Sequence, residues 1–517
     1  MSELFSYDEL PYPSKFFLQT HPDRLATMAV FFGLRPAPVD TCRVLELGCG
    51  NGTDLISHAF HLPDAKFVGV DLAVGHIEDA QRGARELGLT NIEFIQMDVA
   101  MMTVDEFGEF DYIVAHGLFS WVPQFVRDRV LEIFSEMLAP NGIGYISYNA
   151  YPGAHHREMV QRMMRYHSRD VADPAEKVGK AISFLAFLSE NASEKEIFGP
   201  ILQHELQRHF EHEAADIFHD DLSDANRAYY FHEFAAMLAE HELQFLSEAE
   251  LHAMGTGGLS ADAREFVESI DDPIEREQYL DFLRGRIFRQ TLFCRADVAV
   301  DRDPKPDVIR RFKLASSIRP VSPNPEIAST RVEKFAGAKG MGIQIDDPLA
   351  KAALVELGQS WGRAVGFDDL AENAKDELLR RGFESDDWNE RLATLEAILF
   401  QLCRETSLIE LHLFQPEASR EAPEMPRVNA LARWQLPQAN NVLTNLNLDV
   451  KIEDPVSRRL LELLDGTRDL DSIEVEMREF INSSEDVEEK SDLLLRLTDW
   501  LRLSVSQLAK LGMFESE

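Results

Sequence analysis

Short apolar runs alternate with amphipathic stretches between residues 42 and 149 of the chain. Three of the stretches, 53–60, 75–88 and 123–138, space their apolar residues as helices do. Five apolar runs have the length of buried strands: 42–47, 66–72, 92–98, 110–117 and 142–149. Strands that alternate with helices predict a doubly wound parallel α/β sheet, which binds its ligand at the carboxyl ends of the strands.

Two more strands are predicted after a long helical stretch. Residues 155–240 are almost entirely helical in pattern, whereas 243–251 and 287–298 are short apolar runs. We expect these two runs to form a sixth strand and an antiparallel seventh strand that complete the sheet. Residues 155–240 are then a helical insertion between strands five and six, over the strand ends where a substrate must arrive.

Prolines divide the rest of the chain. Those between residues 301 and 328 predict a linker, and a second break with several prolines spans 415–427. The sequence therefore predicts these parts: a sheet domain from 1–154 and 241–300, the helical insertion 155–240, the linker 301–328, a mainly helical middle region 329–427 and a C-terminal domain 428–517.

A glycine-rich turn follows the first predicted strand. Gly48, Gly50 and Gly52 allow the backbone to approach a ligand closely, and Cys49 lies between the first two. The helix that follows points the positive end of its dipole at the same place. Glu46 precedes the turn by two residues, so we expect all five residues to contact the ligand.

Two acidic residues end the neighbouring strands. Asp71, followed by Leu72, ends the second predicted strand and is placed to bind both hydroxyls of a ribose. Asp98, followed by Val99, ends the third strand and is placed to reach an adenine amine or a water beside it. A lone aspartate at a strand end is more often a cap, but the spacing of both acids from the glycine turn favours nucleoside binding.

The spacing of the glycines identifies the expected nucleoside. A dinucleotide-binding turn reads G-x-G-x-x-G, whereas this chain has Thr53 at the position of the third glycine. S-adenosylmethionine (SAM) has no pyrophosphate but carries a methionine ammonium, which suits the carboxylate of Glu46. We therefore predict SAM as the cofactor and the Rossmann-like, seven-stranded fold of class I methyltransferases; a nicotinamide or flavin enzyme is the alternative.

Methyl transfer from a sulfonium depends mainly on positioning and desolvation of the nucleophile. The residues after strands four and five border the methyl group in this fold, and four of them are candidate catalytic residues: His116, Trp121, Asn149 and Tyr151. The side-chain carbonyl of Asn149 can accept a hydrogen bond from a nucleophile that carries an N–H, and His116 can accept a proton near neutral pH. Trp121 and Tyr151 can line a channel and stabilise cations. A structural histidine at 116 and a core anchor at Trp121 are the alternatives.

The opening segment contains Tyr7 and Tyr12 among prolines that hold it extended. We interpret it as a flap over the cofactor; a terminal arm packed on the surface is the alternative. A helix is predicted to begin at His21-Pro22-Asp23, with Asp23 in its first turn.

The net charge of −38 excludes some partners. Such a surface repels nucleic acid and anionic membranes and attracts cationic partners such as a lysine-bearing protein segment, although acidity also serves solubility alone. We expect no secretory signal and no membrane insertion. The four scattered cysteines indicate reduced thiols and a cytoplasmic protein. The histidines of 155–240 lack the spacing of a metal motif, so we expect no metal.

Several segments resemble bacterial SAM-dependent methyltransferases that carry a methyltransferase regulatory domain, a family that includes rickettsial protein-lysine methyltransferases. The segments are VLELGCGNGTDLI, HGLFSWVP, SYNAYPGAHHREMVQRMMRYH, DPIEREQYLDFLRGRIFRQTLFCR and LLELLDGTRDLDSI. The resemblance implies methylation of protein lysines and a winged-helix-like fold for 428–517. Such domains often bind DNA, but 428–517 carries no basic stripe, so we expect a protein-docking or homodimer surface there. Thr53 and Asp54 depart from the family pattern.

Two other functions stay open at this point. A small-molecule methyltransferase would share every cofactor-binding residue, and a non-catalytic SAM-binding scaffold would keep the fold without turnover. The sequence identifies neither the methylated substrate nor the number of methyl groups added.

Overall fold

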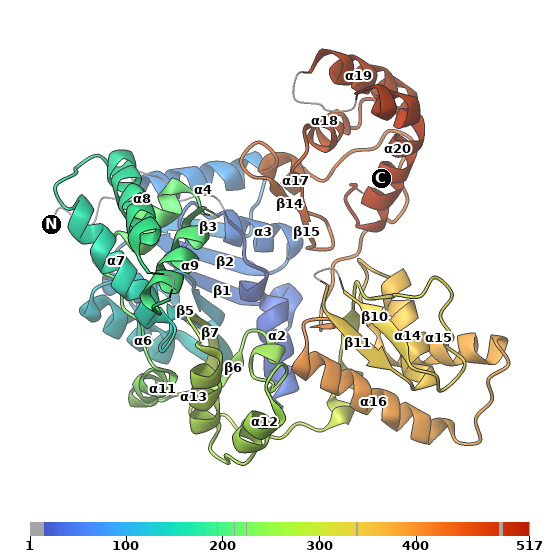
Figure 1. The fold of residues 1–517 in the computed structure, drawn as a ribbon, viewed down its shortest axis with the longest axis horizontal. Helices are drawn as coiled ribbons and strands as arrows, with labels where there is room; N and C mark the ends of the chain where they lie inside the picture. The colour runs from blue at the N-terminus through green and yellow to red at the C-terminus, as the bar shows by residue number, and fades with distance from the viewer. Residues whose placement is uncertain are drawn as a thin grey trace. The chain divides into compact units, whose positions relative to one another are not determined.

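The computed structural model describes residues 15–193, 195–210, 212–223, 225–337, 340–484 and 490–515 (Figure 1). The chain forms two compact units. The first holds Met1–Ile56, Ala65–Arg82 and Asn91–Arg302, and the second holds Ser57–Asp64, Gly83–Thr90 and Asp303–Glu517. Tyr7 and Tyr12 lie outside the described residues, so the predicted flap stays a prediction.

The first unit contains a seven-stranded sheet with the order β3-β2-β1-β4-β5-β7-β6. Its strands are β1 (Arg43–Leu47), β2 (Lys66–Asp71), β3 (Ile92–Gln96), β4 (Phe110–Ala115), β5 (Leu138–Asn149), β6 (Leu243–Glu248) and β7 (Phe288–Arg295). Strands β1 to β5 pair in parallel, and β7 is antiparallel to both β5 and β6. This confirms the predicted class I methyltransferase fold, including the antiparallel seventh strand.

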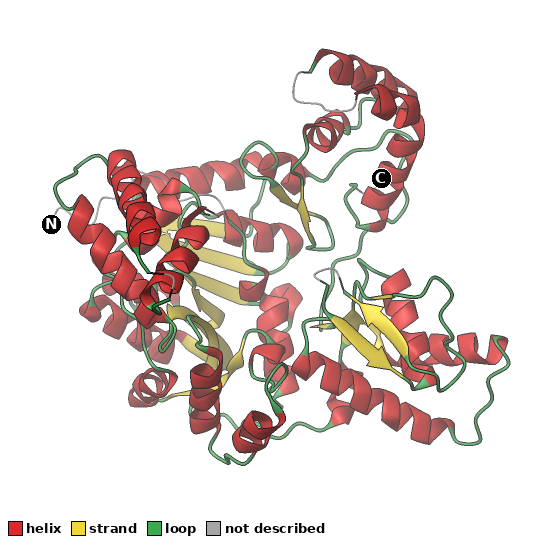
Figure 2. Ribbon diagram, viewed as in Figure 1, coloured by secondary structure: helices red, strands yellow, loops and turns green. Residues whose placement is uncertain are grey.

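Helices cover the sheet on both sides, as the alternation in the sequence predicts (Figure 2). Helix α2 (Pro22–Phe31) precedes the first strand, and the helices among the first five strands are α3 (Thr53–His61), α4 (Val74–Glu86), α5 (Val104–Phe107) and α6 (Gln124–Met137). Four short 3-10 turns accompany them: η1 (Leu18–Thr20), η2 (Val39–Thr41), η3 (Val99–Met101) and η4 (Phe119–Trp121). The core lies between the sheet and α6, where Phe134 meets Phe293 of β7 with ring centroids 4.8 Å apart.

Helices also fill the connection between β5 and β6. They are α7 (Ala154–Ser168), α8 (Pro174–Asn191), α9 (Phe198–Phe210), α10 (Ala214–Asp216), the π-turn η5 (Ile217–Asp221) and α11 (Phe231–Glu240). Val160, Met164, Ala181 and Leu185 belong to a separate small core. Three elements connect β6 to β7: η6 (Leu251–Ala253), α12 (Ala261–Glu268) and α13 (Pro273–Arg284).

The second unit begins with folded structure where the sequence predicts a linker. Residues 306–320 contain η7 (Pro306–Arg311), β8 (Lys313–Ala315) and β9 (Arg319–Pro320). The prediction of a linker is wrong for this stretch because the side chains of Ile309, Phe312 and Leu314 are buried. Its prolines begin a 3-10 turn and end a short strand, positions at which a missing N–H is tolerated.

The second unit continues with small sheets and helices. The strands are β10 (Glu333–Ala336), β11 (Gly342–Ile345), β12 (Val365–Gly366), β13 (Glu410–His412), β14 (Asn441–Leu443) and β15 (Asp449–Lys451). The helices are α14 (Pro348–Gln359), α15 (Phe367–Arg380), α16 (Trp388–Glu405), α17 (Ala430–Gln435), α18 (Pro455–Leu463), α19 (Leu470–Ser483) and α20 (Lys490–Lys510). A hydrophobic core joins residues 428–514.

All four cysteines are buried and unpaired. None of the helices in the described part of the chain combines the length and the hydropathy that crossing a bilayer requires. In the same part of the chain, no three His, Cys, Asp or Glu side chains are grouped so that they could hold a metal ion.

Candidate active site

The glycine turn after β1 adopts the conformation that glycine permits most readily. Gly48, Gly50 and Gly52 have φ angles of 74°, 54° and 74°, where other residues are strained. A Cβ at position 52 would lie 2.6 Å from the ring of Phe94 and 2.7 Å from Cβ of Ala80, whereas a Cβ at Gly50 would meet nothing within 4 Å. Gly52 therefore serves packing, and Gly50 leaves open space at the tip of the turn.

Asp71, at the end of β2, holds this turn. Its Oδ2 accepts a hydrogen bond from the backbone N–H of Gly50 at 2.9 Å, and its Oδ1 accepts one from Ala73 at 2.8 Å. A carboxylate oxygen has two lone pairs, so each can accept one further bond. Asp71 is therefore fixed in orientation and still able to bind two ribose hydroxyls.

Asp98, at the end of β3, is an exposed side chain that caps a short turn. Its Oδ1 accepts a hydrogen bond from the backbone N–H of Ala100 at 2.9 Å and so begins η3. Val99, the next residue, is buried, and Leu72 at the neighbouring strand end is 38% exposed. Both acids thus lie at adjacent strand ends, with Asp98 the less constrained of the two.

Glu46 is buried in β1 beside these acids. Burial, together with the negative charges of Asp54 and Asp71, raises its pKa well above the usual range. Its Oε2 has no hydrogen-bond partner among the described residues. A buried carboxylate oxygen without a donor is costly, and a cation such as a methionine ammonium would satisfy it. Burial likewise raises the pKa of Cys49 well above its usual value, so this thiol in the turn stays protonated.

Asp54, the departure from the family pattern, fastens an N-terminal segment across the start of α3. Its Oδ1 accepts a hydrogen bond from the backbone N–H of Phe17 at 2.6 Å, and its Oδ2 accepts one from Oγ1 of Thr20 at 2.7 Å. Thr53 donates through its hydroxyl to Oδ1 of Asn51 at 2.9 Å. Thr53 and Asp54, which depart from the family pattern, thus make hydrogen bonds that the sequence alone does not reveal.

His116, after β4, packs between two aromatic rings. Its centroid lies 3.8 Å from that of Phe17, and its Nδ1 lies 2.8 Å from the hydroxyl of Tyr145. Burial lowers the pKa of His116 from 6.5 to about 4. Its imidazole is therefore neutral and only weakly basic at neutral pH, and its role as a proton acceptor stays a prediction.

Asn149, the last residue of β5, presents an unpaired acceptor. Its backbone N–H donates to Oγ of Ser120 at 2.9 Å, and its Nδ2 donates to Oδ1 of Asn226 at 2.9 Å. Its Oδ1 is buried and has no partner in the part of the chain that is described. Trp121, next to Ser120, has a buried indole N–H that likewise lacks an acceptor among these residues. An acceptor and a donor thus lie unused after β4 and β5.

The loop that carries Tyr151 is held from two sides. Tyr229 accepts the backbone N–H of Tyr151 at 2.9 Å and donates its own N–H to the carbonyl of Asn149 at 3.0 Å. On the other side, Ala150 donates to the carbonyl of Ile287 at 2.9 Å, and Gly153 donates to that of Arg286 at 3.0 Å. This end of β5 is therefore rigid.

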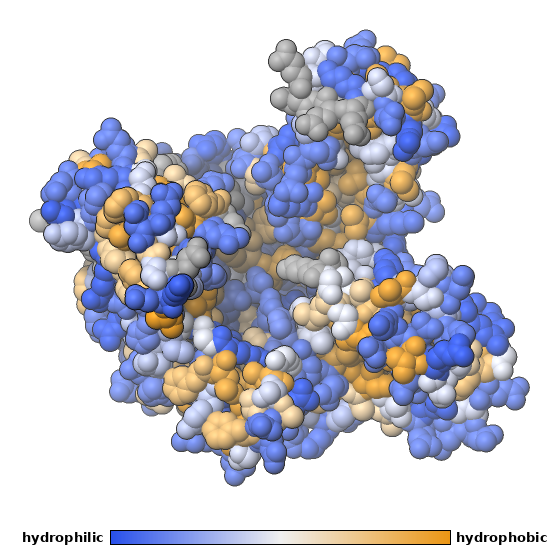
Figure 3. Space-filling view, in the orientation of Figure 1, coloured by the Kyte–Doolittle hydropathy of each residue, from blue (hydrophilic) through white to orange (hydrophobic). Residues whose placement is uncertain are grey.

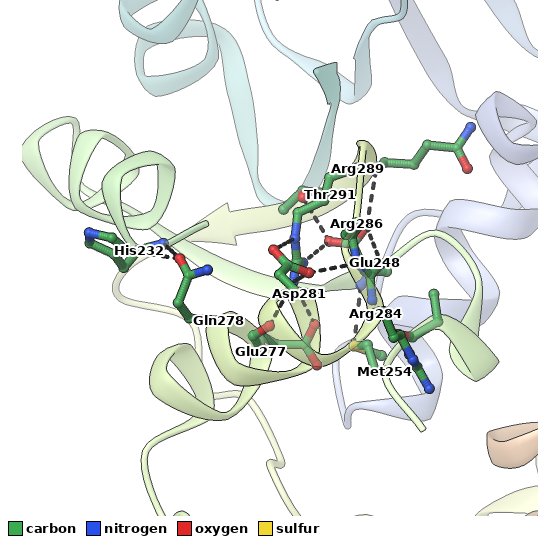
Figure 4. Close-up of polar contacts among 12 residues, drawn as sticks. His232, Glu248, Met254, Glu277, Gln278, Asp281, Arg284, Arg286, Arg289 and Thr291 are labelled. Carbon is green, nitrogen blue, oxygen red and sulfur yellow. Dashed lines mark hydrogen bonds and ion pairs between the residues drawn. The ribbon is translucent and has the colours of Figure 1, made fainter. Parts of the chain in front are cut away.

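A buried ion cluster fixes the second of these sides (Figure 4). Arg289 is fully buried and pairs with Asp281 at 2.8 Å, Glu248 at 2.6 Å and Glu277 at 3.0 Å. Arg286 pairs with Asp281 at 2.6 Å. Burial raises the pKa of Glu277 and of Asp281, although the arginines oppose the shift. The cluster joins α13 to β6 and β7 and holds the segment that contacts the loop.

The hydroxyl of Tyr151 is engaged in a hydrogen bond within the protein. The hydroxyl donates to Oε2 of Glu158 at 2.8 Å, and the ring stacks on His155 with centroids 4.0 Å apart. Burial and Glu158 raise the pKa of Tyr151 to about 12. Its ring also meets that of Tyr230 at 5.2 Å, so Tyr151 contributes an aromatic wall.

An exposed apolar surface continues from this wall across α12 and α13 (Figure 3). The ring centroid of Tyr230 lies 6.1 Å from that of Phe282, which lies 5.8 Å from that of Tyr279. Phe282, Leu283, Ile287 and Phe266 are between 45% and 48% exposed. Exposed apolar groups that gather in this way are typical of binding surfaces.

Three family models match this chain. They are "Methyltransferase domain" over residues 38–213, "Predicted methyltransferase regulatory domain" over 213–295 and "PKMT, C-terminal winged helix domain" over 424–493. Protein RP789 of Rickettsia prowazekii is 34% identical over 381 residues, covering 72% of this chain and 68% of RP789. The chain belongs to the bacterial SAM-dependent methyltransferases that carry a methyltransferase regulatory domain.

Solved structures agree with the family. PKMT2 from Rickettsia typhi in complex with AdoHcy is 27% identical, with a TM-score of 0.86, and the match covers 98% of this chain and 100% of PKMT2. The cofactor of this methyltransferase is therefore SAM, and the C-terminal domain is a winged helix. The unpaired Oε2 of Glu46 and the open tip at Gly50 fit this cofactor.

The structure gathers the predicted cofactor residues at the ends of β1, β2 and β3, and the predicted catalytic residues at the ends of β4 and β5. The sequence pattern does not point to Phe17, Asn226 or Arg289. A hydrophobic residue before a helix, a loop asparagine and a strand arginine carry no local signal, because each acquires its role from residues far away in the sequence.

Proposed function

We propose that this methyltransferase transfers methyl groups from SAM to lysine side chains of a protein substrate. The observation that carries the proposal is the buried Oδ1 of Asn149, an acceptor without a donor in the described structure. A neutral amine supplies such a donor. An alcohol or thiol nucleophile must lose its only proton to react, whereas an amine keeps N–H groups that a fixed acceptor can orient.

The cofactor-binding roles follow from the strand ends. Asp71 binds the ribose, Glu46 binds the methionine ammonium, and Asp98, with Leu72 and Val99 beside it, surrounds the adenine. Gly48, Cys49, Gly50 and Gly52 line the turn against the methionine end. When bound, SAM supplies a methyl group for in-line displacement from its sulfonium.

The residues after β4 and β5 prepare the amine. A free lysine has a pKa of about 10.4, and an aromatic surrounding lowers that value by disfavouring the charge. Asn149 accepts one N–H of the neutral amine and leaves the nitrogen lone pair free to face the methyl group. Trp121 and Tyr151 line the approach, and His116 supports the wall. The proton of the incoming ammonium leaves to water, because burial keeps the pKa of His116 at about 4 and that of Tyr151 at about 12.

Three observations support a protein substrate over a small molecule. PKMT2 matches the chain over nearly its whole length, the C-terminal domain matches a PKMT winged helix, and an exposed apolar surface leads away from Tyr151. The net charge of −38 favours a basic polypeptide and disfavours nucleic acid. A homodimer and a cytoplasmic location stay predictions from the sequence.

The test uses SAM labelled with tritium in its methyl group. The full-length protein is incubated with heat-treated lysate of the expression host, and the proteins are separated on a gel and hydrolysed to amino acids. We expect the label in methylated lysine, and Asn149→Ala should lower the initial rate about 100-fold.

The control variant replaces an asparagine that lies outside the candidate active site. Asn191→Ala changes an exposed asparagine that bonds only to its own helix, through the carbonyl of Phe187, and should act like the wild type. Label confined to small metabolites would refute the protein substrate. Label in arginine, histidine or carboxyl esters would refute lysine as the acceptor.

A further inference from the structure

We propose that Asn226 and Gln161 are positioning residues, which fix the amide of Asn149 with its carbonyl oxygen turned toward the substrate amine. The inference rests on the proposed function of Asn149 and adds two residues of the helical insertion to it. Both belong to elements that follow β5, Gln161 on α7 and Asn226 in the loop after η5.

The three amides form one chain of hydrogen bonds. Nδ2 of Asn149 donates to Oδ1 of Asn226 at 2.9 Å, and Nδ2 of Asn226 donates to Oε1 of Gln161 at 3.4 Å. Nε2 of Gln161 then donates to Oδ1 of Asp221 at 2.8 Å. The chain therefore runs from the substrate side of β5 into the core of the insertion.

The acceptors at the Asp220 and Asp221 end of this series of hydrogen bonds determine which atom donates and which accepts in each of them. The backbone carbonyl of Asp220 can only accept, and it lies 3.0 Å from Nδ2 of Asn226. An ionised carboxylate also only accepts. Burial alone would raise the pKa of Asp221, but a hydrogen bond from His209 and the charges of Arg157 and Arg208 together lower it. Asp221 is therefore ionised at neutral pH.

These acceptors leave one arrangement for every amide. Gln161 must point its NH2 group at Asp221, and Asn226 must point its NH2 group at Asp220. Oδ1 of Asn226 then faces Asn149, which has to donate through Nδ2. The free group of Asn149 is thus its carbonyl oxygen, whichever way the oxygen and nitrogen of each amide are first assigned.

For catalysis, the hydrogen bond from Asn149 to Asn226 prevents the amide of Asn149 from adopting the wrong orientation. An Asn149 amide without Asn226 could turn its NH2 group toward the amine, and two donors would then face each other. Arg157, Arg208 and His209 hold Asp221 at 3.1, 3.2 and 3.1 Å, so the helical insertion sets the state of a residue on β5. The folding of the insertion is thereby coupled to the reactivity of the site.

The experiment compares Asn226→Leu, which keeps the branched side-chain shape and removes the amide, with the matched control Asn191→Leu on α8. Initial rates of methyl incorporation into lysate protein, the KM for SAM and calorimetric affinity for S-adenosylhomocysteine are measured on the full chain. We expect the rate of Asn226→Leu to fall about tenfold, as for one lost hydrogen bond, with the KM and the affinity unchanged.

A double-mutant cycle separates positioning from stability. Adding Asn226→Leu to Asn149→Ala should cause no further loss, because Asn226 acts only through Asn149. Should Asn226→Leu fail to fold, Gln161→Met breaks the next link and should lower the rate by a smaller factor, again only when Asn149 is present.

Three results would overturn the inference, and a fourth would refute the proposed function of Asn149 itself. Additive losses in the cycle, or an equal fall in S-adenosylhomocysteine affinity, would make the role of Asn226 merely structural. A normal rate in Asn226→Leu beside a low rate in Asn149→Ala would remove the chain of amides and keep the proposed function. A normal rate in Asn149→Ala would refute the role that the proposed function gives to Asn149.

Discussion

The cofactor side and the substrate side of this active site are built in different ways. At β1 and β2 the parts are close in sequence: a turn of three glycines, and an aspartate that binds the N–H of Gly50 at 2.9 Å. At β4 and β5 they are farther apart, since Asn149 depends on Ser120, 29 residues away, and on Asn226, 77 residues away. Local pattern therefore encodes cofactor binding, whereas tertiary structure encodes the handling of the substrate.

The largest expected effect lies on the cofactor side. Gly52→Val forces a branched side chain into a position with φ of 74° and into Phe94 and Ala80. Backbone strain and overpacking together should lower the free energy of unfolding by about 3 kcal/mol or more and abolish S-adenosylhomocysteine binding. Urea unfolding and calorimetry measure both effects.

Gly88→Ala is the control for this variant. Gly88 also has a positive φ, 67°, but a Cβ there would meet nothing within 4 Å, so it should cost only about 1–2 kcal/mol. Equal losses in the two variants would show that the contact with Phe94 is unimportant.

Asp71→Ala and Asn149→Ala should separate cofactor affinity from methylation rate. Removing Asp71 takes away charged hydrogen bonds and should weaken S-adenosylhomocysteine binding by about 1–3 kcal/mol. Asn149→Ala should leave that affinity within about twofold while the methylation rate falls. Calorimetry beside initial-rate assays separates the outcomes, and wild-type affinity in Asp71→Ala would contradict the assigned ribose contact.

Glu46 gives cofactor binding a dependence on pH. Its pKa is raised in the free protein, and a bound ammonium lowers that pKa by favouring the carboxylate. Binding therefore releases protons, and affinity rises with pH by at most about tenfold per pH unit, or about 1.4 kcal/mol, below the raised pKa.

Calorimetry of S-adenosylhomocysteine binding in two buffers with different heats of ionisation counts these protons. Glu46→Gln should bind more weakly and release none from this site. Equal proton release from the variant and the wild type would assign the proton to another group.

The smallest expected effect is that of Asp98→Ala. The side chain is exposed and caps a 3-10 turn through the N–H of Ala100, so its loss should weaken S-adenosylhomocysteine binding by about 0.5–1 kcal/mol. Titration followed by intrinsic fluorescence measures it. If Asp98→Ala lost as much S-adenosylhomocysteine affinity as Asp71→Ala, adenine recognition would be the main determinant of cofactor affinity.

The same contrast explains how far the sequence could be interpreted. Apolar runs and glycine spacing predicted all seven strands, the turn and the two strand-end acids, because each feature occupies a few consecutive residues. The prolines after residue 301 were misleading, since burial of Ile309 and Leu314 decides their structure. Neither the contact of Phe17 with His116 nor the cluster around Arg289 could be predicted, because partners far apart in the chain create both.

The order of the strands has a consequence for synthesis of the chain. β5 is almost wholly buried, and its neighbour β7 pairs Phe288 with Asn149 only after the insertion, β6 and two further helices have been made. A nascent chain on the ribosome therefore carries an apolar strand with an open edge, which is prone to aggregate. We expect the yield of folded protein to depend on chaperones that cover this edge until translation passes Arg295.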